Sequence, residues 1–152
     1  MNTLAQPRDK TQLLERLDTL RPDSVHRWGR MSAHEMVCHL GDGFRMGIGQ
    51  KRVSPATSRL QRTMVKWIAL YAPVRWPAGI PTRPEIEQGT GGTWPGDFAS
   101  DVADLVTLVN VFASQDSGFE WPPHPIFGPL SGRAWLRWGY LHMDHHLRQF
   151  GA

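Results

Sequence analysis

Three histidines lie within five residues near the end of the 152-residue sequence, at positions 142, 145 and 146. His142 and His146 are four residues apart, so on a helix they are neighbours on one face. Two imidazoles at this spacing can bind the same metal ion. The alternative is a pair of buried neutral imidazoles, each hydrogen-bonded to a neighbour. The spacing favours metal ligands, because two adjacent imidazoles would otherwise need separate partners at one place.

The pattern around the pair predicts a helix from about residue 131 to 150. At about 100° per residue, His142 and His146 share a face with residues that suit an interior, namely Trp135, Trp138, Gly139, Gln149 and Phe150. The opposite face is charged and is expected in solvent, with Arg133, Arg137, Asp144 and Arg148. Gly139 would let another helix or a ligand approach closely. His145, about 100° from His146, is expected in a supporting or surface position, although it could replace one of the pair.

A third ligand has to come from another helix, and His39 is the best candidate. Ser32 and Glu35 form a capping box, which predicts that a helix starts there. His39 then lies beside an apolar stripe, where the alternative to a ligand is a satisfied boundary histidine. His34, in the first turn, is expected to be exposed. The remaining histidines are weaker candidates because they are expected in loops, at His26 and His124.

Three neutral histidines are ligands that suit zinc, nickel or another borderline divalent ion. Three protein ligands leave a position open for water or substrate, which is typical of catalytic rather than structural sites. The chain has one cysteine, Cys38, so a cysteine-based structural zinc site is not expected. Cys38 is interpreted as a small core residue rather than a reactive thiol.

The other expected elements are also helices, joined by long loops. Apolar spacing predicts helices over residues 9–20 and 97–114. A third helix is expected to begin at Ser54-Pro55, with an inward face formed by Leu60, Met64, Trp67, Ile68 and Tyr71. The connection 73–96 is rich in proline and glycine, and its Trp76, Ile80 and Trp94 are expected to pack on the helices. Together these elements predict an all-α antiparallel bundle forming a single domain over residues 1–152.

Composition narrows the class of protein. The net charge is +3 and the basic residues are scattered, whereas nucleic-acid binders gather them on one face. No stretch is long and apolar enough for a membrane span, and the first ten residues show no signal-peptide pattern. The single cysteine fits a reducing compartment. We therefore expect a soluble cytoplasmic protein that binds neither nucleic acid nor membrane, and the seven tryptophans suggest an aromatic interior around polar ligands.

Several of these motifs together resemble a known superfamily. His39, the pair His142 and His146, and Gln149 three residues further on are similar to the DinB-like superfamily, whose members are regarded as metalloenzymes. The chain resembles one bacterial subgroup of unknown function more closely. Three segments carry this resemblance: Trp28-Gly29-Arg30-Met31-Ser32, Phe127-Gly128-Pro129-Leu130, and the ending His142-Met143-Asp144-His145-His146-Leu147-Arg148-Gln149-Phe150-Gly151. The region between Lys51 and Trp94 carries little of this resemblance.

The resemblance implies a fold and a site. The fold would be an up-down-down-up four-helix bundle with a long middle crossover and an additional short helix or long loops. The metal ligands would be His39, His142 and His146, the ion zinc or nickel, and the assembly a homodimer. Characterised relatives of this type include transferases and isomerases that use bacillithiol, mycothiol or glutathione.

Two functions from different classes follow. The first is a metal-dependent S-transferase or hydrolase, in which the metal activates a low-molecular-weight thiol or water to attack a small-molecule substrate in a tryptophan-lined pocket. Gln149 would orient a ligand histidine or the bound species. Asp42 and Arg45 are weak candidates for an acid–base group and an anion contact, since both are expected to be exposed. The second function is a non-enzymatic metal- or ligand-binding module.

Overall fold

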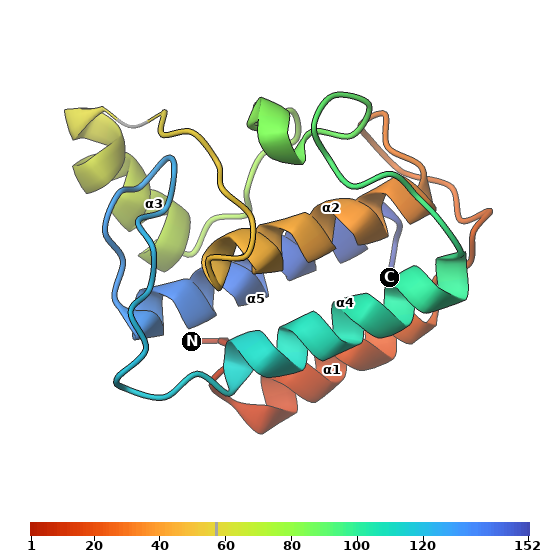
Figure 1. Ribbon diagram of the computed structural model, residues 1–152, viewed down its shortest axis with the longest axis horizontal. Helices are drawn as coiled ribbons and strands as arrows, with labels where there is room; N and C mark the ends of the chain where they lie inside the picture. Colours follow the sequence, from red (N-terminus) through yellow and green to blue (C-terminus); the bar gives the residue numbers. More distant parts are fainter. Residues whose placement is uncertain (57) are drawn as a thin grey trace.

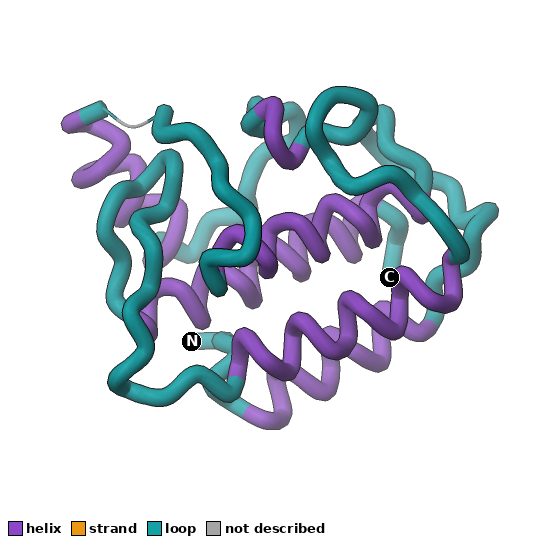
Figure 2. Tube along the Cα trace, viewed as in Figure 1, coloured by secondary structure: helices purple, strands orange, loops and turns teal. Residues whose placement is uncertain are grey.

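All the regular secondary structure in the part that the structure describes is helical. A computed structural model describes residues 1–56 and 58–152, and within these ranges it contains helices and loops but no strand (Figure 2). The elements in chain order are α1 (Pro7–Asp18), α2 (Ala33–Gly47), the π-helix η1 (Gln61–Val65), α3 (Lys66–Tyr71), the 3₁₀-helix η2 (Pro84–Ile86), α4 (Phe98–Ala113) and α5 (Gly132–Gln149). The expected all-α class is confirmed. None of the described helices combines the length and the apolarity that a membrane span requires.

The four long helices lie alongside one another (Figure 1). Helix α2 packs against both α4 and α5, and α1 packs against α5. Aromatic rings fill the space between these helices: Phe44 of α2, Phe112 of α4 and Trp135 of α5 are all fully buried. The ring centroids of Phe44 and Phe112 are 5.1 Å apart, edge to face. This aromatic contact joins α2 to α4.

Polar caps start three of the long helices. The Ser32 hydroxyl accepts a hydrogen bond from the backbone of Glu35, whose carboxylate in turn accepts one from the Ser32 backbone, so the predicted capping box is present. Asp97 caps α4 and Ser131 caps α5 in the same way, each by accepting from a backbone N–H three residues later. These side chains satisfy backbone donors that have no partner inside a helix. The predicted starts of α2, α4 and α5 are therefore confirmed.

The expected third helix differs from the observed one. Residues 54–56 are not helical, so the predicted start at Ser54-Pro55 is wrong. The face that was expected to point inward is exposed, by 55% at Leu60 and Met64, 61% at Trp67 and 41% at Ile68. Leu70 is the buried residue of α3, and the Arg137 guanidinium donates to its carbonyl oxygen at 3.0 Å. Apolar spacing shows which residues share a face, but not which face meets the core.

The connection between α3 and α4 packs on the helices at some of its residues. The indole N–H of Trp76 donates to the Ala69 carbonyl oxygen at 2.7 Å, and Ile86 in η2 is buried. The expectation that Ile80 and Trp94 also pack is wrong, because they are 46% and 74% exposed. This connection therefore lies against the helices through Trp76 and η2.

The charged face of α5 is partly covered rather than open to solvent as expected. Asp144 lies 2.7 Å from Arg16 of α1 and 2.9 Å from Arg148 on its own helix. Arg137 donates to the backbone of residues 2 and 70. Only Arg133 of this face is exposed. Polar contacts of this kind attach the N-terminal segment and α1 to the outer side of α5.

The corrected position of α3 can be tested by substitution. Leu70→Ala removes a fully buried side chain and is expected to lower the free energy of unfolding by about 2–5 kcal/mol. Trp67→Ala, on the exposed face, is expected to change it by about 0.5 kcal/mol or less. Urea unfolding of both variants measures the difference. A larger loss for Trp67→Ala than for Leu70→Ala would contradict the observed orientation.

Candidate metal centre

Three histidines from two helices converge in the interior. His39 of α2 and His142 and His146 of α5 are 3%, 7% and 9% exposed. Their ring centroids form a nearly regular triangle, with separations of 5.1 Å between His39 and His142, 4.8 Å between His39 and His146, and 4.9 Å between the last two. One nitrogen from each ring lies within 4.8 Å of the other two. The sequence-predicted third histidine is therefore placed beside the predicted pair.

The orientation of the His39 ring is fixed from outside the triangle. Its Nδ1 lies 2.9 Å from the carbonyl oxygen of Ile86, in η2. A carbonyl oxygen only accepts hydrogen bonds, so Nδ1 carries the proton. Nε2 of the neutral ring then presents its lone pair to the centre of the triangle.

Gln149 fixes the His146 ring in the same way, as the sequence led us to expect. Its amide nitrogen donates to the Trp28 carbonyl oxygen at 2.8 Å, which leaves the amide oxygen facing His146. Nδ1 of His146 lies 2.9 Å from that oxygen and donates to it. Nε2 of His146 therefore also presents a lone pair inward. A metal-binding histidine typically donates its second ring N–H to such a partner.

His142 is positioned by packing rather than by a hydrogen bond to its outer nitrogen. Its ring stacks on Trp138 with centroids 4.7 Å apart. Its Nδ1 is buried and has no hydrogen-bond partner among the described residues. Gly43 of α2 makes room for the ring, since a Cβ at that position would lie 2.8 Å from Cε1 of His142. Any larger residue at position 43 would displace this imidazole.

The inward nitrogens are arranged as a divalent ion would need them. Nε2 of His39 and Nε2 of His142 are 3.2 Å apart, and two nitrogens bound to one tetrahedral zinc ion are about 3.4 Å apart. If no ion is present, a single proton on Nε2 of His142 can satisfy only one of the two lone pairs from His39 and His146. A cation satisfies every lone pair at once. The buried group could therefore hold a metal ion.

Burial keeps these imidazoles neutral, which is the form that binds metals. Loss of hydration lowers the pKa of His39, and it lowers the pKa of His142 and His146 well below the ordinary value. Repulsion from the neighbouring imidazoles lowers the pKa of His142 and His146 further. Neutral rings present their lone pairs at a pH where free histidines would be partly protonated.

Aromatic rings and a fourth histidine surround the triangle. His145 packs against His146, Trp28 and Trp76, with centroid separations of 5.0, 6.0 and 6.1 Å. The Trp76 ring also lies 6.4 Å from His142. His145 is buried, which agrees with the supporting position expected for it rather than with a surface one. The tryptophans expected around the site are thus present at Trp28, Trp76 and Trp138.

Asp42 is not the exposed acid–base candidate that the sequence suggested. It is fully buried and accepts hydrogen bonds from the backbone and the hydroxyl of Thr93, at 2.7 and 2.6 Å. Lys51 lies 2.9 Å away and Arg45 lies 3.6 Å away. The carboxylate therefore fastens the α3–α4 connection to α2. Arg45 is engaged in the same ion pair instead of being free for an anion.

Two further histidines differ from expectation. His34 is half-buried, not exposed, and lies 2.6 Å from Asp101 of α4. His124 is buried although it lies in a loop, and its Nδ1 accepts from the backbone of Ile126 and Phe127. Burial lowers the pKa of His124 to about 3. Sequence alone could not find these positions, because Asp101 beside His34 and the rings of Trp135 and Trp138 around His124 come from other segments of the chain.

Comparison with known proteins identifies one match. The sequence model of a family described as "Protein of unknown function (DUF1569)" matches residues 5–152. No curated protein matches the chain, and no solved structure matches it. The match extends over both helices of the histidine triangle.

The stability of the metal-free protein is expected to fall as the pH decreases. His39, His124, His142, His145 and His146 all have a lowered pKa in the fold, so below about pH 6.5 the unfolded chain binds more protons. The free energy of unfolding should be fully retained above pH 6.5. Below it, each histidine that stays neutral should cost up to about 1.4 kcal/mol per pH unit.

Urea unfolding in the presence of a chelator, between pH 7.5 and 5, measures this slope. His146→Gln should give a shallower slope than the wild type, because one neutral imidazole is gone. A curve that stays flat down to pH 5 would contradict the burial of the histidines.

Proposed function

The chain belongs to the DUF1569 family of proteins of unknown function, and from that premise we propose that it is a divalent-metal-binding protein whose ligands are His39, His142 and His146. The observation that carries the proposal is the convergence of three buried imidazoles. Hydrogen bonds to Ile86 and Gln149 orient two of these rings so that their inward nitrogens keep a free lone pair. Zinc or nickel suits a set of three neutral nitrogen donors.

We further propose that the fold is of the DinB type, an up-down-down-up four-helix bundle. The course of the chain in Figure 1 supports this proposal, since α1 and α5 run in one direction and α2 and α4 in the other. The long connection between α2 and α4 would be the middle crossover. The position of Gln149 behind His146 is a second feature in common with the resemblance described above.

The chemistry would be that of a metal-dependent thiol S-transferase or hydrolase. A bound divalent ion would act as a Lewis acid that lowers the pKa of a low-molecular-weight thiol or a water molecule in its remaining position. The protein residues would orient the ligand rings through Ile86 and Gln149. Trp76 and Trp28 would limit the access of bulk water to this side of the triangle. The thiol would be of the bacillithiol, mycothiol or glutathione type.

A non-enzymatic metal- or ligand-binding module is the second candidate. The observation that favours it is the low exposure of the three ligands, at most 9%, which leaves little room for a substrate beside the rings. After metal loading, a screen of thiols against electrophilic substrates separates the two functions. Turnover that disappears on chelation supports the enzyme, and stoichiometric binding without turnover supports the module.

Removal of any one ligand is expected to abolish tight binding. Isothermal titration with Ni²⁺ and elemental analysis should show a bound equivalent in the wild type. His39→Ala, His142→Ala and His146→Ala should each weaken the binding of that equivalent by about 100-fold or more, because two imidazoles hold the ion less well than three. The control is His26→Ala, which removes an exposed histidine and should change nothing. Wild-type affinity in any of the three ligand variants would overturn the site.

Gly43 offers a test that substitutes none of the three ligand residues. Gly43→Ala puts a methyl group against the His142 ring and is expected to weaken Ni²⁺ binding by roughly 10–100-fold, similar to the loss of a ligand-orienting contact. Gly41→Ala is the matched control, on the same helix, where the added Cβ would meet the flexible end of Arg45 at 3.1 Å. Titration of both variants gives the comparison. Equal affinities would show that the position of the His142 ring does not determine binding.

A further inference from the structure

A second group of metal-ligand residue types lies between α2 and α4, apart from the histidine triangle. His34 and Cys38 are one helical turn apart on α2, and Asp101 lies in the first turn of α4. A ring nitrogen of His34, Sγ of Cys38 and a carboxylate oxygen of Asp101 all lie within 4.8 Å of one another. His39 is about 100° round the helix from Cys38, so the two groups occupy different faces of α2.

We propose that His34, Cys38 and Asp101 form a second cation site, which takes a thiophilic divalent ion such as zinc or cadmium. Histidine nitrogen, cysteine sulfur and carboxylate oxygen are all established zinc ligands. A thiolate and a carboxylate together neutralise a divalent ion, whereas the three histidines of the first centre are neutral ligands. The sulfur ligand makes the second site the softer of the two.

The distances leave only a small rearrangement to be made. Sγ of Cys38 lies 3.7 Å from Oδ2 of Asp101, close to the separation of two ligands on one tetrahedral ion. Nε2 of His34 lies 2.6 Å from the same oxygen, so binding requires those two atoms to separate by about 0.8 Å. The side chains of His34 and Asp101 are 18% and 22% exposed, which gives them room to move.

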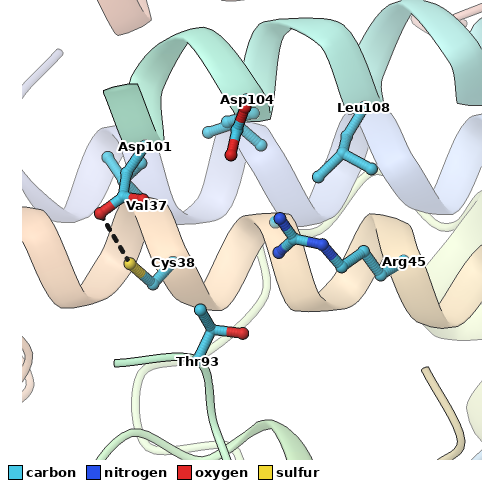
Figure 3. Close-up of a pocket in the computed structure, with 9 residues that line it drawn as sticks. Val37, Cys38, Arg45, Thr93, Asp101, Asp104 and Leu108 are labelled. Atoms are coloured by element: carbon cyan, nitrogen blue, oxygen red, sulfur yellow. Dashed lines mark hydrogen bonds between the residues drawn. The ribbon is translucent and has the colours of Figure 1, made fainter. Parts of the chain in front are cut away.

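A small cavity beside the cluster has room for a further ligand. Its volume is about 10 Å³, close to the space that one water molecule needs. Figure 3 shows Cys38 facing Asp101, with Asp104 on the next turn of α4 and Thr93 on the other side of the cavity. A water molecule or the Asp104 carboxylate can complete the coordination of an ion there. Arg45 also lines the cavity, but its charge is paired with Asp42.

The thiol of Cys38 stays protonated when no ion is bound. Burial, and then the charge of Asp101, raise its pKa to about 12. The cysteine is therefore a poor nucleophile in this position. On metal binding, the sulfur–hydrogen bond is replaced by a sulfur–metal bond, and the proton passes to solvent. No oxidation or reduction is involved.

Cobalt titration tests the proposal, because a thiolate bound to Co²⁺ gives a charge-transfer band in the near ultraviolet. Cys38 is the sole cysteine, so such a band can come only from this residue. The double variant His142→Ala, His146→Ala removes the first centre and should retain the band with one bound equivalent. Cys38→Ser, which keeps a hydroxyl near Asp101, should lose the band and one equivalent. His34→Gln should weaken the binding at least tenfold.

The outcomes separate this site from the first centre. A band in the double variant supports the second site whether or not the three histidines bind metal. No band in the wild type at saturating Co²⁺ would overturn the proposal, and would show that the three side chains form a hydrogen-bonded cluster only. Two other results would also overturn it. One is an unchanged Co²⁺ affinity, measured from the band, in His34→Gln, and the other is loss of the band in the double variant. Circular dichroism of each variant establishes that the fold is retained.

Discussion

The crossing of α2 and α5 depends on three imidazoles that share a buried space without charge. Each ring is held by a different part of the chain: His39 by the carbonyl of Ile86, His146 by Gln149, and His142 by the face of Trp138. A charged ring here would lose its hydration and repel its neighbours. The loops that supply these contacts are in turn fastened to the helices, as Asp42 fastens residue 93.

Features set by local chemistry could be predicted from the sequence. The caps at Ser32 and Ser131 depend on a side chain and a backbone amide three residues apart, so they are visible in the sequence. The inward face of α5 was predictable because charged and apolar residues alternate with the helical period. The position of His39 beside the pair came from its apolar stripe and from the resemblance, and the structure brings the three rings together.

Features set by distant partners could not be predicted in this way. Asp42 appears in the sequence as a polar helix residue. Its buried carboxylate is stabilised by a hydrogen bond from Thr93 and by the charge of Lys51, which lie outside α2. His124 lies in a proline-rich loop, yet its ring is enclosed by Trp135 and Trp138. Helix α3 has a regular apolar spacing, but the surface that it meets is contributed by α5, and it presents Leu70 to that surface rather than Trp67.

The glycines of α2 have a consequence for how the protein folds. Ring atoms of neighbouring helices fill the space where side chains at Gly43 and Gly47 would lie. A Cβ at Gly47, for example, would lie 2.5 Å from Phe112. Each glycine disfavours the isolated helix by about 1 kcal/mol, so this segment has little helical propensity of its own. It becomes a stable helix only when α4 and α5 supply the rings that fill those positions. The position of His39, the one imidazole of the triangle that α2 supplies, therefore depends on the packing of α2 against α4 and α5 and not on α2 alone.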